Sequence, residues 1–416
     1  MIKLLDYGII YLHGKMPTPI KDYLENKFDK IKDLKFIVAN KVILEGINLP
    51  IDNMFLINLN RVNMKQLVNL IGRVNRLNTI FSGDEKHLGK LNPRIHFINN
   101  KTYNSKDKGI HNPKLLKLRN RFFKDEISNP TLYNQNKKSK NKAKDLKIKK
   151  EEEFLDSEHK DVKSKIKKYF IQNSLNIYYD DLDATIEILF KNYDQIKDKE
   201  FNKLNVLDLV YELFVNNLDD NITDIEFLRL RHQATRNYYN YYIDVTAKAE
   251  LKYAIKNTIK SFIEKGKSDN PLLYFGSGYG EVKYKSSKYD GIAEVYVDLS
   301  KYLNNGTKLV NLAIVKLKME EDFSSFTLKK FVDALFDFRI ITETQKNKFV
   351  YGSEDKKEQE LFKFGLSKKI INQLKAANQI KNLFINEFGN ISPHEEFNNY
   401  LSSLDEFKRF ELEKFF

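Results

Sequence analysis

Two arginines, Arg73 and Arg76, stand three residues apart in the stretch NLIGRVNRLN (69–78), and the first of them directly follows Gly72. The apolar spacing predicts a helix over 64–77, and side chains three residues apart lie on one face of a helix. A guanidinium group stays charged and donates forked hydrogen bonds that match phosphate oxygens. The pair therefore predicts a phosphate-binding site. The alternative is a surface helix whose arginines form salt bridges.

Two further segments precede the arginine pair, HGKMP (13–17) and VANKVILEGINLP (38–50), and both adjoin apolar runs that predict strands. Each segment alone is a weak signal, because short matches are common. Taken in order with the arginine segment, they resemble the second RecA-like domain of superfamily 2 helicases. The resemblance is strongest to the DEAD/DEAH-box-like bacterial helicases of the exosome-helicase and repair-helicase branch, and it implies an α/β fold with a parallel sheet.

The resemblance gives the arginine segment a role in ATP hydrolysis. Gly72, Arg73 and Arg76 match motif VI, in which the arginines reach the γ-phosphate of ATP and the last, Arg76, acts as the arginine finger. Such a finger neutralises charge on the transferred phosphoryl group and is worth about 10³–10⁵ in rate. Asn69 and Asn75 depart from the glutamine and glycine that the family usually has there.

The resemblance also assigns candidate residues to motif V and to the nucleic-acid side of the cleft. Glu45, Gly46 and Asn48 fall in the motif V turn, which faces the cleft between motor domains and needs a glycine for close backbone approach. Asn40 replaces a threonine that commonly contacts a nucleic-acid phosphate, and asparagine can make the same hydrogen bond. His13, at the start of HGKMP, is a further candidate for contact with nucleic acid.

The chain has no G-x-x-x-x-G-K-[ST] loop, whose amides and lysine would hold the β- and γ-phosphates. ATP and Mg²⁺ would therefore be bound mainly by a first RecA-like domain that carries the Walker A and Walker B motifs. We expect that domain on another chain or in a missing part of the gene product. On this reading the 416 residues do not hydrolyse ATP alone.

Composition narrows the class of protein. A formal net charge of +14 favours a polyanionic partner, most simply nucleic acid. Without cysteine there is no disulfide or thiolate metal site, and the seven histidines form no tight pair, so we predict no metal centre. No apolar run approaches the length of a membrane span, and we expect a cytoplasmic protein without a membrane partner.

The first hundred residues alternate predicted strands with predicted helices, which is typical of a parallel, doubly wound sheet with function at the carboxyl ends of its strands. The predicted strands are 7–13, 34–40, 52–58 and 94–99, and the predicted helices are 19–31 and 64–77. We assign residues 1–105 to the RecA-like domain. Residues 106–165 read as a basic linker, with eight lysines between Lys137 and Lys150. A nucleic-acid-binding arm is the alternative for this segment.

Residues 166–270 have mostly amphipathic helical periodicity and form a predicted accessory domain. Its stretch RLRHQATRNYYNYY (229–242) sets Arg229 and Arg236 along one helical stripe followed by tyrosines, which predicts contact with a nucleic-acid backbone and bases. The alternative is a solvated basic face with the tyrosines in the core.

Residues 271–416 are predicted to mix a β-hairpin with helices. Its strands would be 289–300 and 308–318, joined by NNG. GSGYG (276–280) precedes a predicted hairpin instead of a helix and so predicts a turn, not a dinucleotide site. EVK (281–283), with Asp269 or Asp290, loosely resembles the carboxylate–lysine set of a magnesium-dependent nuclease, which remains an alternative.

The sequence as a whole predicts the C-terminal part of an ATP-dependent helicase or translocase that acts on single-stranded DNA or RNA. The alternative is a non-enzymatic nucleic-acid-binding or scaffold protein derived from a helicase half. Many bacterial helicases of the type it resembles belong to antiphage defence systems, which suggests that context here.

Overall fold

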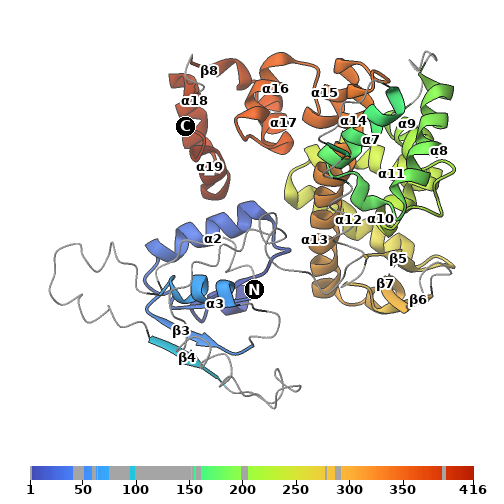
Figure 1. Cartoon of the computed structure of the whole chain (residues 1–416). Coiled ribbons are helices and arrows are strands. Elements are labelled where there is room, and N and C mark those ends of the chain that lie inside the picture. Colours follow the sequence, from blue (N-terminus) through green and yellow to red (C-terminus); the bar gives the residue numbers. More distant parts are fainter. Residues whose placement is uncertain are drawn as a thin grey trace, which may run out of the picture. The chain divides into compact units, whose positions relative to one another are not determined.

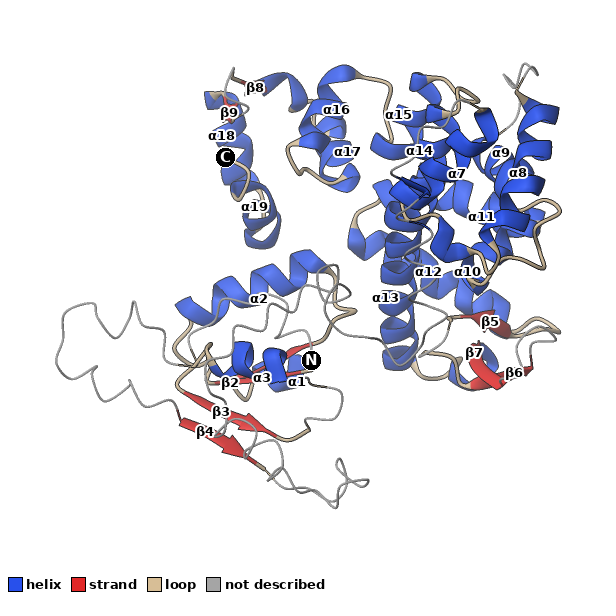
Figure 2. Ribbon diagram, viewed as in Figure 1, coloured by secondary structure: helices blue, strands red, loops and turns tan. Residues whose placement is uncertain are grey.

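The computed structural model describes residues 2–40, 51–58, 62, 64–74, 94–98, 151, 154–155, 161–197, 205–276, 279–285, 292–386 and 390–416. The chain divides into two compact units, residues 1–138 and 139–416, each of which is described by itself (Figure 1). Strands and helices alternate in the first unit, and helices dominate the second (Figure 2).

Unit 1 contains two strand–helix–strand segments with parallel pairing. Their elements are α1 (Ile2–Leu5), β1 (Ile9–Leu12), α2 (Thr18–Lys30), β2 (Phe36–Ala39), β3 (Asn53–Leu56), α3 (Met64–Ile71) and β4 (Arg94–Phe97). Strand β1 pairs with β2 and β3 pairs with β4, both in parallel. The predicted strands and their parallel pairing are confirmed, in two two-stranded sheets among the described residues, while the single doubly wound, RecA-like sheet stays a prediction.

Alternation along the strands explains how unit 1 builds its core. Ile10 and Leu12 of β1 are buried with Leu24 of α2, while Tyr11 between them is exposed. Likewise Met54 and Leu56 of β3 pack with Leu67 and Leu70 of α3. Successive side chains of a strand point to opposite faces, so each helix covers one face of its strand pair.

Most of the helices of unit 2 surround one large hydrophobic core. They are α7 (Val162–Gln172), η5 (Asn176–Tyr178), α8 (Leu182–Ile196), α9 (Val206–Phe214), α10 (Ile225–Leu228), η6 (Arg229–Arg231), α11 (Gln233–Asp244), η9 (Phe323–Leu328), α14 (Lys329–Asp337) and α15 (Glu343–Tyr351). Side-chain caps begin several of them, such as Asp181 before α8 and Asn205 before α9. The core joins residues on both sides of position 270, so the predicted boundary there does not separate two cores.

A smaller core of unit 2 lies between a three-stranded antiparallel sheet and two helices. The sheet has the order β5 (Leu272–Tyr274), β7 (Ile292–Asp298), β6 (Val282–Lys285). It packs with α12 (Leu251–Gly266), η8 (Leu299–Tyr302) and α13 (Gly306–Asp322). The short η7 (Thr246–Lys248) precedes α12, and its Ala247 packs against the large core. Phe262, Phe275 and Leu309 are among the buried side chains that fill this core.

The C-terminal elements of unit 2 have a core of their own. They are α16 (Lys356–Lys363), α17 (Lys368–Ala376), η10 (Ile380–Asn382), β8 (Leu383–Ile385), β9 (Ile391–Pro393), α18 (Glu395–Ser403) and α19 (Glu406–Glu413). The predicted helical tail is confirmed, with a short antiparallel β8–β9 pair added to it.

The strand predicted at 308–318 is wrong, because this segment forms helix α13. Its buried positions, Leu309, Leu312, Ala313 and Lys316, follow helical spacing. The predicted NNG hairpin turn is instead the start of that helix, where the side chain of Asn305 accepts a hydrogen bond from the Lys308 backbone nitrogen at 3.0 Å. Among the described residues, the predicted hairpin region therefore forms its sheet from β5, β6 and β7.

Among the described residues, no helix combines the length and apolar character that crossing a membrane requires. The cytoplasmic location stays a prediction.

Candidate functional site

The carboxyl ends of β1 and β2 bring two predicted site residues to the same edge of their sheet. Leu12 and Ala39 are register partners in the parallel pair, and His13 and Asn40 follow them directly. The Asn40 backbone nitrogen donates to the Leu12 carbonyl at 3.4 Å. Polar side chains at the carboxyl ends of neighbouring parallel strands can meet one ligand, which is the arrangement that the sequence predicts.

The ring of His13 is held in place locally. Its Nδ1 atom accepts a hydrogen bond from the Lys15 backbone nitrogen at 3.1 Å, and the ring stacks on Tyr11 with centroids 6.3 Å apart. With Nδ1 as acceptor, a neutral ring carries its proton on Nε2. His13 thus offers one N–H donor at this edge of the sheet.

Helix α3 ends before the arginine pair, so the prediction of a helix over 64–77 is wrong in its last part. The backbone nitrogens of Gly72 and Arg73 donate to Val68 and Leu70, at 2.9 and 3.2 Å, and close the final turn. Arg73 lies in that turn, half-buried, and does not stand on a regular helix face. Whether it converges with Arg76 stays a prediction, because Arg76 lies outside the described residues.

A β-bridge joins the ends of the two motif segments. Ile51, which follows the motif V candidates, pairs in parallel with Val74, which follows Arg73. Ile51 also packs against the cores of both strand pairs. The fold therefore places Ile51, which directly follows the motif V segment, beside Val74, which directly follows Arg73. The motif V candidates themselves, Glu45, Gly46 and Asn48, lie outside the described residues.

Comparison with protein families agrees with this arrangement. Residues 1–78 match the helicase conserved C-terminal domain. The match ends directly after the arginine segment, so it covers the motif candidates and none of unit 2. A helicase C-terminal domain implies interaction with nucleic acid, and the particular helicase branch stays a prediction. Neither a curated protein nor a solved structure matches the chain.

One tetrapeptide with the spelling of a magnesium-binding box, Asp-Glu-x-His, does occur after the helicase C-terminal match. It runs from Asp84 to His87 and lies outside the described residues. A glycine, Gly83, precedes it, where a buried strand of apolar residues would be needed to place it at the end of a sheet. We therefore do not assign magnesium binding to this tetrapeptide, and we expect both the magnesium-binding box and the P-loop on the partner domain.

In unit 2 the two arginines predicted to contact nucleic acid have different surroundings. Arg236 is buried, forms an ion pair with Asp208 at 2.6 Å and donates to the carbonyls of Leu230 and Arg231. Its guanidinium also lies over the ring of Tyr211. Since the nitrogens of Arg236 already have partners inside the protein, its role in this fold is to tie η6 to α9 and α11.

Arg229, which is half-buried, belongs to a polar cluster formed by side chains of α10, η6, β5 and α13. Its guanidinium lies over the ring of Tyr274 at 4.0 Å. Nearby, Lys316 forms an ion pair with Glu320, and both side chains are buried. Burial, together with the charges of Asp224 and Glu320, raises the pKa of Glu226, against a lowering effect of Lys316 and Arg229. The cluster consists of mutually compensating charges, so it fits a structural role better than phosphate binding.

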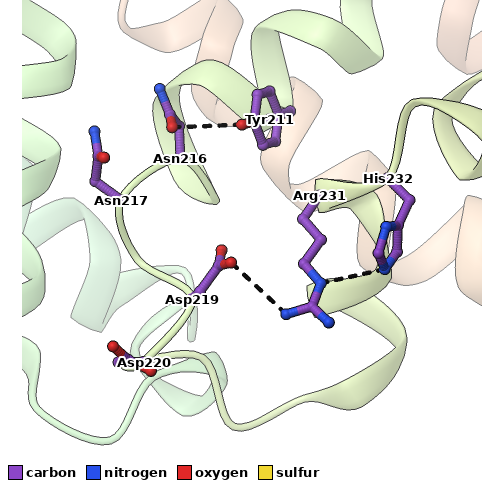
Figure 3. Close-up of a pocket in the computed structure, with 7 residues that line it drawn as sticks. All are labelled: Tyr211, Asn216, Asn217, Asp219, Asp220, Arg231 and His232. Carbon is purple, nitrogen blue, oxygen red and sulfur yellow. Dashed lines mark hydrogen bonds and ion pairs between the residues drawn. The ribbon is translucent and has the colours of Figure 1, made fainter.

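The sequence analysis missed a polar pocket of about 510 Å³ at the end of α9. It is lined by Tyr211, Asn216, Asn217, Asp219, Asp220, Arg231 and His232 (Figure 3). Arg231 reaches Asp219 at 3.7 Å and donates from Nε to His232 Nε2 at 3.2 Å. Burial and the neighbouring arginines, Arg231 first, lower the pKa of His232. Two aspartates against one arginine disfavour a phosphate here, so this pocket is not the expected phosphate site.

The nuclease alternative gains no support from the residues that are described. Glu281 accepts hydrogen bonds from the Tyr302 hydroxyl and from Lys308 Nζ, the second at 3.0 Å. These donors lower the pKa of Glu281, against the effect of its burial. Within the described ranges, no three histidine or carboxylate side chains come together as a metal site.

Proposed function

We propose that the chain supplies the C-terminal motor half of an ATP-dependent nucleic-acid helicase or translocase. ATP and Mg²⁺ are held mainly by a first RecA-like domain with Walker A and Walker B motifs, on another chain or domain. Unit 1 closes over that nucleotide with its motif V turn and its motif VI arginines, Arg73 and Arg76. The observation that carries the proposal is the helicase C-terminal match over residues 1–78, which the structure folds as the parallel β1–α2–β2 segment followed by β3 and α3.

The arrangement of unit 1 supports a role in coupling ATP to nucleic acid. His13 and Asn40 follow neighbouring parallel strands, and the Ile51–Val74 bridge ties the segment after motif V to the turn that holds Arg73. Any movement of Arg73 on binding or release of the γ-phosphate is therefore passed to the motif V segment. In that proposal Glu45, Gly46 and Asn48 line the cleft, while Asn40 and His13 face the nucleic-acid backbone.

The decisive experiment is ATP hydrolysis by the reconstituted motor. A first RecA-like domain encoded beside this chain is added in trans, and hydrolysis is measured with and without single-stranded DNA or RNA. Arg76→Ala is expected to lower the stimulated rate by about 10³-fold or more, because an arginine finger acts only in the transition state. Arg94→Ala, at an exposed position of β4 in the same unit, is the matched control and keeps the rate.

Two results would count against the proposal. An Arg76→Ala variant as active as the control would remove the arginine-finger assignment. Single-strand binding by this chain, without ATP hydrolysis in any reconstituted mixture, would instead favour the scaffold alternative, which the departures at Asn69 and Asn75 also favour. The antiphage-defence setting stays a prediction.

A further inference from the structure

One exposed side of helix α12 carries three lysines in a row. Lys252, Lys256 and Lys260 are spaced four residues apart and are all exposed. Residues at this spacing follow one another along a helix face at intervals of about 6 Å. Tyr253, 58% exposed, and Asn257 lie beside them on the same side. We call these five residues the α12 ridge.

The opposite side of α12 fixes the orientation of the ridge. Ala254 and Phe262 are buried, and Ile255, Ile259 and Ile263 pack against the core shared with α13 and the β5–β7–β6 sheet. Gly266 ends this packed side, where an added Cβ would lie 2.8 Å from Leu303 Cδ2. Because the helix is held by its apolar side, the lysines must face outward.

The ridge lysines have no acidic partner among the described residues, unlike several other lysines of unit 2, and they stand in a row on one helix. Lys163 of α7 pairs with Glu187, and Lys329 of α14 pairs with Asp333 at 2.6 Å. Lys252, Lys256 and Lys260 form no ion pair within the described part of the chain. Three lysines in a line that form no ion pair attract a linear polyanion, and the exposed Glu264, four residues after Lys260, lowers the net charge only at that end of the row.

We propose that the α12 ridge binds the sugar-phosphate backbone of a single nucleic-acid strand. The three lysines contact successive phosphates, and Tyr253 offers its exposed ring for stacking with an unpaired base. A duplex does not present base faces to such a ring. A membrane surface fits less well, because the exposed side of α12 has no aliphatic side chain and its apolar side is occupied by the core.

The inference rests on the proposed function, since it names a place where the accessory unit holds the strand on which the motor acts. It assigns the nucleic-acid contact of unit 2 to α12, in place of the α11 arginine that is buried. It also gives a physical purpose to part of the net positive charge of +14.

The test compares two lysine variants of the full chain. The ridge variant carries Lys252→Gln, Lys256→Gln and Lys260→Gln, and glutamine keeps helix propensity close to that of lysine. The control variant carries Lys191→Gln, Lys356→Gln and Lys381→Gln, which remove the same charge from scattered, exposed sites that are also unpaired among the described residues. Binding of a fluorescent oligothymidylate of about 16 nucleotides is measured over a series of salt concentrations.

Each phosphate contact on a single strand adds about 0.7 to the slope of log affinity against log salt. The ridge variant is therefore expected to lose about 2 units of slope, which corresponds to about a hundredfold in affinity at 0.1 M salt. The control variant is expected to keep the wild-type slope. Tyr253→Ala should weaken binding by roughly 5- to 150-fold, with recovery in Tyr253→Phe, because stacking needs only the ring.

Equal slopes for the ridge and control variants would overturn the proposal, as would a wild-type chain that does not bind the oligothymidylate. Equal affinity for a duplex of the same length would overturn the single-strand assignment. The ATP hydrolysis assay separates these failures from failure of the proposed function. If hydrolysis depends on Arg76 while the ridge variant binds normally, the motor stands and the ridge does not.

Discussion

The buried ion pair between Lys316 and Glu320 allows a stability prediction that depends directly on the geometry. Only 6% of Lys316 and 2% of Glu320 are exposed, one helical turn apart on α13. Lys316 Nζ also donates to the Tyr274 backbone carbonyl at 3.0 Å, which ties α13 to β5. Replacing Lys316 by methionine keeps the volume of the side chain and removes its charge and its donor.

The expected cost comes from the carboxylate that remains. Loss of one partner leaves Glu320 charged and buried, and breaking a buried pair in this way costs about 3–5 kcal/mol of unfolding free energy. In the double variant Lys316→Met with Glu320→Leu, both charges of the buried pair are removed, and such replacements are often neutral or stabilising. The double variant still loses the donor to Tyr274, worth about 1 kcal/mol. It should therefore be more stable than the single variant by about 2–4 kcal/mol.

Urea unfolding of the full chain, followed by circular dichroism at the helix band, measures these differences because most described helices belong to unit 2. Lys318→Met is the matched control on the same helix. Lys318 pairs with Glu321 at 2.9 Å, but Glu321 is more than half exposed, and an exposed pair is worth about 1 kcal/mol or less. The reasoning is refuted if Lys316→Met costs no more than Lys318→Met, or if the double variant is as unstable as the single one.

Two further predictions concern other buried or strained positions of unit 2. Burial first, and then the charge of Lys248, lower the pKa of Lys368 to about 8, while an unfolded lysine titrates near 10.5. Between these two pH values the folded chain therefore binds fewer protons than the unfolded chain. The free energy of unfolding consequently rises with pH across this window, by up to about 3 kcal/mol, and this contribution is absent at lower pH. The difference in stability between wild type and Lys368→Met, measured by thermal unfolding over this pH range, should show this rise. The control variant Lys381→Met should keep the pH dependence of wild type. Gly276 has φ +76°, and an added Cβ would lie 2.8 Å from Glu226 Oε1. Gly276→Ala should cost about 1–3 kcal/mol, while Gly306→Ala, whose Cβ would meet nothing, should be neutral or stabilising; similar melting temperatures for the two would contradict this.

The strands of unit 1 could be predicted because their pattern is local. Apolar runs bounded by polar turns mark β1 and β2, and alternation between buried and exposed positions decides which side α2 covers. The end of α3 could not be predicted in this way. Val74 continues the apolar spacing of the helix, but it pairs with Ile51, and that contact comes from the fold of the whole unit.

Helix α13 was mistaken for a strand because VNLAIV is short, apolar and rich in β-branched residues. A local signal for the helix was nevertheless present. Asn305 and Gly306 form an N-terminal cap, and Leu309, Leu312, Ala313 and Lys316 repeat at helical spacing. The buried Lys316 interrupts this otherwise apolar repeat and so obscures the helical pattern. It fits the pattern once its ion-pair partner Glu320, one turn later on the same face, is considered.

The same distinction between local and distant partners decides which cations can reach a ligand. Arg236 stands on a basic stripe in the sequence, but Asp208, on a different helix, neutralises it, and no spacing within α11 could reveal that pairing. Around Lys252 and Lys256, by contrast, no acidic residue stands three or four positions away on α12. The helix itself therefore places no acidic side chain next to these two lysines, and they form no ion pair with any other described residue. Their availability follows from spacing together with packing, and for that reason α12 is a better candidate for the nucleic-acid contact than α11.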